Sequence, residues 1–194
     1  MEEKTDIIKK ACEMLLNSSK IDALTLINDK YRFSCPTIIK RHYSEADKLR
    51  IFIRDGFIDR YSGKKLLVPS ILKVLSFYFP KDFPYQEHWK MSETHIAYWE
   101  LIPTIDHILP ISVGGENSME NCVTTSMKNN SIKSNWTLDQ LGWKLYTSGS
   151  NNDWDGLIGL FIQIVDNDKD FLKDNYIRRW YNLIKAMTTE DNIY

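Results

Sequence analysis

The chain has 194 residues, of which 43% are hydrophobic, 26% charged and 12% aromatic, and its formal net charge is -1. This composition is typical of a globular protein with its own apolar core, and it excludes collagen-like, low-complexity and wholly disordered proteins. The balanced charge also excludes a protein that binds polyanions through its overall charge, so any such binding requires a local basic patch.

The chain carries three cysteines, Cys12, Cys35 and Cys122, with no CxxC pair. An odd number at irregular spacing argues against a disulfide framework and against a zinc site built from cysteines. The first ten residues carry acids where a secretory signal has a basic leader, and no apolar run reaches the roughly 20 residues that cross a bilayer. We therefore expect a cytoplasmic protein with no membrane partner.

The N-terminal region, residues 1–46, is predicted to be mainly helical. Apolar residues recur at helical spacing over 2–17, and the Asn-Ser-Ser that follows predicts the end of that helix. Shorter helices are expected over 21–28 and 36–42, an order that only loosely resembles a helix-turn-helix. We interpret these helices as a brace on the core rather than as a DNA-reading motif.

The next segment is predicted to contain a capped helix and a hairpin. Ser44 with Asp47 three residues later is a capping-box pattern, and it predicts a helix that ends at Gly56. Residues with high β-propensity on both sides of a Ser-Gly pair predict a tight hairpin over 57–68.

Residues 66–100 are rich in aromatic side chains. These could form a platform for base stacking, but Pro80 and Pro84 interrupt them, so a structured insertion packed on the core is the better interpretation. His88 and His95 lie in this insertion without the cysteine or carboxylate neighbours of a metal site. We interpret both histidines as structural or surface residues.

A strand, a loop, a second strand and a helix are predicted in the centre of the chain. Apolar and polar residues alternate over 98–110, which predicts a strand that ends at a proline. A glycine-containing turn follows, and a second strand is expected around 121–124. Thr125 or Ser126 is a suitable N-cap for a helix over 127–133. These elements form a ββα unit.

The C-terminal region is predicted to be helical again. Thr137 and Gln140 form a second capping-box pattern, for a short helix that ends near Gly142. Apolar stripes predict two longer helices, over 154–165 and 171–187, and such stripes are usually packing surfaces.

The predicted fold class is therefore α+β, mainly helical, with a central ββα finger and a small antiparallel hairpin. We expect a helical region over 1–46, a core over 47–136 with the aromatic insertion at about 66–100, and C-terminal helices over 137–194 that pack on this core. The three regions are expected to form one compact unit.

Residues with catalytic chemistry are concentrated in the ββα unit. Asp106 and His107 precede two aliphatic residues and a proline, Asn121 follows Asp106 by fifteen residues, and Asn130 lies nine residues further. Together these residues resemble the HNH nuclease family, also called ββα-metal or His-Me finger, in a His-Asn-Asn version. The resemblance covers about thirty residues and includes the HNH domain of RNA-guided CRISPR nucleases.

The resemblance implies a role for each of these side chains. His107 is expected to act as the general base that takes a proton from water. Asp106 and Asn130 would offer hard oxygen ligands to one Mg²⁺ or Mn²⁺ ion. Asn121 would tie the loop by hydrogen bonds and so hold His107 in position. Because adjacent residues on a strand face opposite ways, a site that uses both Asp106 and His107 requires the strand to end or distort there.

The sequence departs from many family members at the positions of a structural zinc. Where those proteins have two CxxC pairs, this chain has Asp59, Ser62, Ser126 and Asn129. We expect no structural zinc, with packing by the aromatic insertion and the terminal helices in its place.

Candidate DNA contacts come from two parts of the chain. Lys133 shares a helical face with Asn130, where it would meet a backbone phosphate or remain a solvated lysine. Residues 1–65 hold 14 Lys and Arg against 10 Asp and Glu, a local basic surplus. The complete set of candidate contacts is Lys133, Lys128, Arg54, Arg60, Lys40, Arg41 and Arg50.

The predicted function is that of a metal-dependent endonuclease acting on double-stranded DNA, suited to restriction or defence. A homodimer would be the economical way to cut both strands. The main alternative is a non-catalytic DNA-binding or protein-interaction module on the same fold. A hydrolase built on Cys122 and His107 ranks last, because no oxyanion hole is evident.

Overall fold

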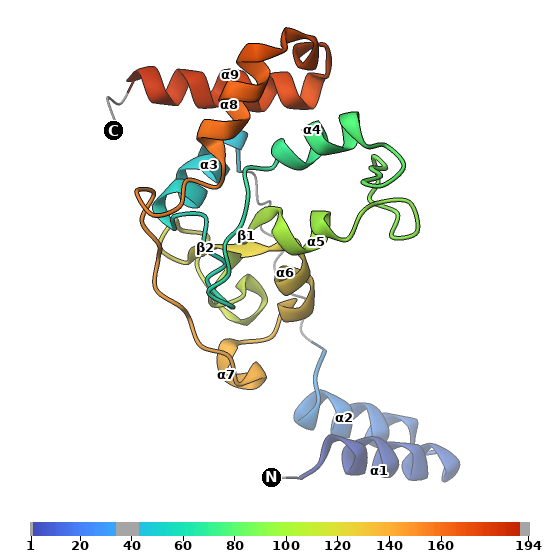
Figure 1. The fold of residues 1–194 in the computed structure, drawn as a ribbon. Helices are drawn as coiled ribbons and strands as arrows, with labels where there is room; N and C mark the ends of the chain where they lie inside the picture. The colour runs from blue at the N-terminus through green and yellow to red at the C-terminus, as the bar shows by residue number, and fades with distance from the viewer. Residues whose placement is uncertain (1, 34–42, 191–194) are drawn as a thin grey trace. The chain divides into compact units, whose positions relative to one another are not determined.

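The computed structural model describes residues 2–33 and 43–190. The helices are α1 (Lys4–Leu16), α2 (Lys20–Lys30), α3 (Glu45–Arg54), α4 (Ile71–Tyr78), α5 (Ala97–Leu101), α6 (Met127–Lys133), α7 (Leu138–Leu141), α8 (Ile158–Asn167) and α9 (Asn175–Glu190). The strands are β1 (Pro103–His107) and β2 (Cys122–Ser126), which form the one sheet in the described ranges. The α+β class, mainly helical with a small antiparallel sheet, is confirmed (Figure 1).

The chain divides into two compact units, Met1–Ile38 and Ile39–Tyr194. In the first unit, α1 and α2 pack on each other, and the buried side chains are Ile7, Ala11 and Ala23. The helix expected over 36–42 lies outside the described residues. Within those residues, no helix is long and apolar enough to cross a membrane.

The second unit is built on one apolar core. Helices α3, α4, α8 and α9 each bury side chains in it, among them Phe52, Leu72, Phe161 and Trp180. The aromatic insertion joins the same core, because Phe83, Tyr85 and Trp89 surround the buried ring of Tyr98. Aromatic residues of the insertion thus pack on the core, which agrees with the interpretation of this segment as a structured insertion.

Two helices occur where the sequence analysis expected other structure. The apolar run Ile71–Tyr78 is helix α4, although the sequence analysis predicts no helix within the insertion. Ala97–Leu101 is helix α5 rather than the first half of a strand. A proline disfavours the helical region in the residue before it, and Ile102 is accordingly extended, with φ -77° and ψ 125°. Pro103 therefore ends the helix, and β1 begins there.

Other boundaries also differ from the predictions. The hairpin expected over 57–68 is reduced to a single antiparallel bridge, between Ile58 and Lys65. Helix α8 begins at Ile158 rather than at residue 154, because Gly156 and Leu157 both have left-handed backbone with positive φ.

The predicted capping boxes are present. Ser44 and Asp47 exchange hydrogen bonds at the start of α3, and Thr137 and Gln140 do so at the start of α7. Helix α6 is capped by Ser126, whose Oγ accepts from the Asn129 backbone N–H at 3.1 Å. These local signals place the helices because a side-chain acceptor satisfies a backbone N–H that has no partner within the helix.

The carboxylate of Asp59, one of the four positions at which the family resemblance places zinc ligands, is hydrogen-bonded to two of the other three, Ser126 and Asn129. Asp59 Oδ2 accepts from Asn129 Nδ2 at 2.8 Å and from the Ser126 N–H at 3.0 Å, while Oδ1 accepts from Thr125 Oγ1 at 3.0 Å. Asp59 is 1% exposed. Hydrogen bonds therefore link the 57–68 segment to β2 and α6, a role that the sequence analysis gave to packing alone.

Candidate functional site

The ββα unit is formed by β1, β2 and α6. The strands are antiparallel, with Asp106 opposite Val123 and His107 opposite Cys122, and α6 packs against both of them (Figure 1). Because the cap residue Ser126 is also the last residue of β2, the helix starts directly at the end of that strand. Strand β1 ends at His107, the place where the sequence analysis required it to end or distort.

Asn121 closes the loop between the two strands. Its Oδ1 accepts from the Leu109 N–H at 2.9 Å, and its Nδ2 donates to the Leu109 and Glu116 carbonyls at 2.9 and 2.7 Å. Gly115 allows this tight closure, since a Cβ there would lie 1.9 Å from the Leu109 oxygen. All the polar atoms of the Asn121 side chain are thus used to fix the backbone that follows His107.

Asp106 faces α6 and is held at one of its two oxygens. Its Oδ2 lies 2.8 Å from Lys133 Nζ and accepts from the Tyr61 hydroxyl at 2.7 Å. Burial raises the pKa of Tyr61, and the Asp106 carboxylate raises it further, so the phenol keeps its proton and donates. Within the described chain, Asp106 Oδ1 receives no hydrogen bond.

Asn130 lies on α6 and contacts the backbone of β1. Its Nδ2 donates to the Ile105 carbonyl at 3.4 Å, a long hydrogen bond that turns the amide toward β1. No described residue donates to its Oδ1. Asp106 contacts α6 through Lys133, and Asn130 contacts β1 through the Ile105 carbonyl. Each of the two side chains has one oxygen that makes no hydrogen bond to the described protein.

His107 is buried, with 4% of its surface exposed, and is held at Nε2. This nitrogen lies 3.0 Å from Asn117 Oδ1 and 3.1 Å from the Tyr43 hydroxyl, which itself donates to Asn117 Oδ1 at 2.6 Å. Because an amide oxygen only accepts, Nε2 carries the proton in neutral His107. Nδ1 then keeps its lone pair, the state that a general base requires.

Cys122 lies beside this histidine, with Sγ 3.0 Å from the Tyr43 hydroxyl. Burial raises the pKa of the Cys122 thiol, which disfavours the thiolate that a cysteine nucleophile needs. The environment therefore argues against the hydrolase built on Cys122 and His107.

The residues present fit a hard divalent cation. Mg²⁺ binds one or two protein oxygens and keeps several waters, and the carboxylate of Asp106 and the amide of Asn130 are oxygen donors of the kind that it prefers. In the described part of the chain, no three His, Cys, Asp or Glu side chains are grouped to hold a metal ion. A site here thus depends on the amide oxygen of Asn130 and on water or substrate oxygens.

The candidate DNA contacts have different environments. Arg54 and Arg60 both bind the buried Asp55 carboxylate, and Arg60 also donates to Ser148 Oγ at 3.0 Å. Lys128 is exposed and pairs with Glu100 at 3.0 Å. Lys40 and Arg41 lie outside the described residues.

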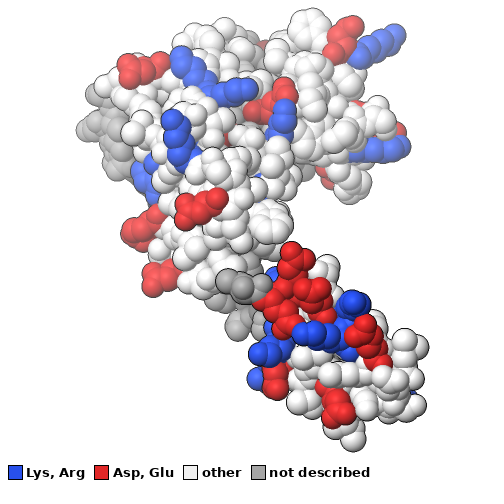
Figure 2. Space-filling view, turned by 90° about the horizontal axis from the view of Figure 1, so that it is seen from below, with Lys and Arg blue, Asp and Glu red and all other residues white. Residues whose placement is uncertain are grey.

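The surface charge is mixed. Figure 2 shows Lys and Arg interspersed with Asp and Glu on the face drawn, rather than gathered in one basic surface. Independently of that view, the exposed Arg50 pairs with Asp47 at 3.3 Å. Contacts to a polyanion on this face would therefore be local.

The sequence analysis missed three residues of the site. Tyr43 lies just before α3, Tyr61 lies in the 57–68 segment, and Asn117 lies in the loop that was treated only as a turn. None belongs to the spacing pattern of the motif. Their roles arise from tertiary contacts, which no local signal in one sequence reveals.

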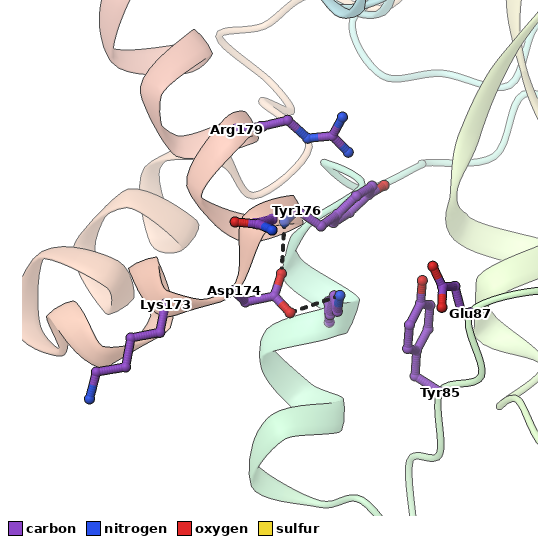
Figure 3. A pocket seen from close by; sticks show the side chains of 8 residues that line it. Tyr85, Glu87, Lys173, Asp174, Tyr176 and Arg179 are labelled. Carbon is purple, nitrogen blue, oxygen red and sulfur yellow. Dashed lines mark hydrogen bonds and ion pairs between the residues drawn. The ribbon is translucent and has the colours of Figure 1, made fainter.

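A separate pocket of about 500 Å³ lies away from the motif, between the start of α9, α4 and the aromatic insertion. Figure 3 shows Tyr85 and Glu87 on one side of it, and Asp174, Tyr176 and Arg179 on the other. The ammonium group of Lys73 lies 2.8 Å from Asp174 Oδ2 and 4.9 Å from the centre of the Tyr85 ring. The positive charge of Lys73 is thus balanced by the carboxylate of Asp174, and both residues line the pocket.

The Lys73–Asp174 pair gives a prediction about pH. Burial has the largest single effect and raises the pKa of Asp174. The hydrogen bonds from Lys73 and from the Ile177 and Tyr176 backbone N–H groups, together with the charge of Lys73, outweigh it and leave the pKa below the ordinary aspartate value. Such a group stabilises the fold above its unfolded pKa and loses this contribution as the pH falls through its folded pKa. Asp174→Asn, which can still cap α9, should cost about 0.5–1 kcal/mol at pH 7.

Urea unfolding of both proteins over a pH series measures this effect. The difference in unfolding free energy should shrink as the pH falls below about 4. A difference that stays the same across the series would contradict this assignment.

The fold and the site together define a ββα finger with a His-Asn-Asn set. Residues 92–138 match the family model described as HNH endonuclease. Neither a curated protein nor a solved structure gives a match to the chain. The matched segment contains the whole ββα unit, so the comparison confirms the resemblance to HNH endonucleases that was stated from the sequence.

Proposed function

We propose that this protein is a metal-dependent endonuclease that hydrolyses DNA phosphodiester bonds, with His107 as the general base. The observation that carries the proposal is shared by three motif side chains. Asp106, His107 and Asn130 are each bound by the protein at one polar atom, and each leaves the atom that the chemistry needs without a hydrogen bond to residues 2–33 or 43–190. Such an arrangement orients reacting groups before the substrate binds.

The proton transfer is assigned to one nitrogen of the histidine. His107 Nδ1 takes the proton from the attacking water, while Nε2–H keeps its hydrogen bond to Asn117 Oδ1 at 3.0 Å. The same acceptor stabilises the imidazolium that forms, because a charged donor strengthens the hydrogen bond. Tyr43 and Asn117 are thus positioning residues for the base.

Asp106 Oδ1 and Asn130 Oδ1 are the proposed ligands of a single Mg²⁺ or Mn²⁺ ion. When bound, the ion offsets the charge that develops on the phosphorane and on the leaving 3′ oxygen. Tyr61 and Lys133 hold the other oxygen of Asp106 and so orient the carboxylate. Asn121 acts through the loop that it closes rather than as a ligand.

We assign the substrate as double-stranded DNA and the setting as restriction or defence in the cytoplasm, with a homodimer to cut both strands. Cys12 and Cys122 are free thiols, in keeping with a reducing compartment. The exposed Lys128, on the same helix as Asn130, is the proposed phosphate contact nearest the motif. We assign Arg54 and Arg60 first to the buried Asp55, which both of them bind.

Incubation of the purified protein with supercoiled plasmid tests the proposal. Nicked or linear products are expected with Mg²⁺ or Mn²⁺ and should disappear when EDTA is added. If no divalent ion supports cleavage but gel shifts still show binding, the alternative of a non-catalytic module is correct. The steepness of the salt dependence in those gel shifts then reports the number of phosphate contacts.

A further inference from the structure

We propose that the ammonium group of Lys133 is the resident counter-charge of Asp106 and competes with a divalent cation for that carboxylate. The inference rests on the proposed function, since it takes Asp106 as a metal ligand. It begins from the placement of Lys133, which is 0% exposed although lysine is almost never fully buried unless it is paired.

Lys133 is fixed in this place by three neighbours. Its Nζ lies 2.8 Å from Asp106 Oδ2, donates to the His107 carbonyl at 2.8 Å and lies 5.6 Å from the centre of the Tyr61 ring. Movement into water would break the ion pair and leave the Asp106 carboxylate, only 12% exposed, without a balancing charge. The positive charge therefore remains beside Asp106 whether or not a cation is bound.

This placement has a direct effect on cation affinity. A cation on Asp106 Oδ1 and the ammonium at Oδ2 share one carboxylate, and like charges repel strongly where little water screens them. The ammonium also supplies the neutralisation that a cation would otherwise provide. Lys133 thus stabilises the cation-free protein and weakens the binding of a divalent ion.

Calorimetric titration with Mn²⁺ alone tests this in the full-length protein. Lys133→Met removes the charge with little change in side-chain length, and it should lower the Kd for Mn²⁺ by about tenfold or more. Thermal unfolding gives an independent readout. The variant should be less stable than wild type in EDTA, and Mn²⁺ should raise its Tm more than it raises that of wild type.

Lys73→Met is the matched control, because Lys73 also pairs with an aspartate at 2.8 Å but lies away from the motif. It should lose stability and leave the Mn²⁺ affinity unchanged. Lys133→Arg, which keeps the charge, should bind Mn²⁺ like wild type. Lys133→Gln gives the same comparison if the methionine variant does not fold.

An equal or weaker Mn²⁺ affinity in the neutral Lys133 variants would overturn the competition while leaving the proposed metal site intact. Failure of both wild type and these variants to bind Mn²⁺ would instead contradict the metal site itself. Binding that is detected only after the charge is removed would support the competition most strongly.

Discussion

Replacement of His107 by alanine is expected to lower the rate of plasmid cleavage by about 10²–10⁴-fold, the usual contribution of a positioned general base. The reason is geometric. The Nε2 atom is bound by Asn117 and lies close to Tyr43, so the ring presents Nδ1 as the proton acceptor. Single-turnover cleavage of supercoiled plasmid, with saturating Mg²⁺ and excess protein, measures the loss.

Two variants make this result specific. His88→Ala removes an exposed histidine and should leave the rate unchanged. Asn117→Ala keeps the base but removes the acceptor that orients it, so it should lower the rate less than His107→Ala does. Equal cleavage by wild type and His107→Ala would show that the activity comes from a contaminant or that His107 is not the base.

Local signals in the sequence were enough to locate the ββα unit. The cap at Ser126, the glycine-containing loop and the spacing of Asn121 and Asn130 from Asp106 all act within about thirty residues. The capping box at Ser44 likewise placed α3 correctly. Short-range hydrogen bonds of this kind depend on residue type and offset, which is why one sequence reveals them.

Contacts between segments far apart in the chain could not be predicted from such local signals. The Tyr61 hydroxyl reaches Asp106 across 45 positions, and Tyr43 reaches His107 across 64. The boundary between α5 and β1 was missed for a different reason, because alternation over a few residues also fits one helical turn. The proline at 103 was the better signal, since it restricts the residue before it.

The roles of Arg54 and Arg60 also depend on contacts that the sequence alone does not show. From the sequence, Arg54 and Arg60 counted toward a basic patch. In the structure both bind Asp55, which is 0% exposed and whose Oδ2 also accepts from the Thr124 N–H at 2.7 Å. One carboxylate thereby connects α3, the 57–68 segment and β2, and it supports the strand that pairs with the one carrying Asp106 and His107.

Asp55→Ala is therefore expected to destabilise the protein by about 3–5 kcal/mol, because removal of one partner from a buried ion pair leaves an uncompensated charge. The variant would strand the guanidinium of Arg60, whose side chain is 13% exposed, together with the buried backbone N–H of Thr124. Urea unfolding followed by tryptophan fluorescence measures the loss. Asp153→Ala, at an exposed carboxylate, is the control and should unfold at the wild-type midpoint.

A double-mutant cycle separates the structural role of Arg60 from a DNA contact. If Arg60 serves mainly to balance Asp55, the double variant Asp55→Ala/Arg60→Met should lose clearly less stability than the sum of the two single variants, because the stranded charge is gone. Additive losses would show that the two side chains act independently. In that case Arg60 would return to the set of candidate phosphate contacts, and its substitution should reduce the salt dependence of DNA binding.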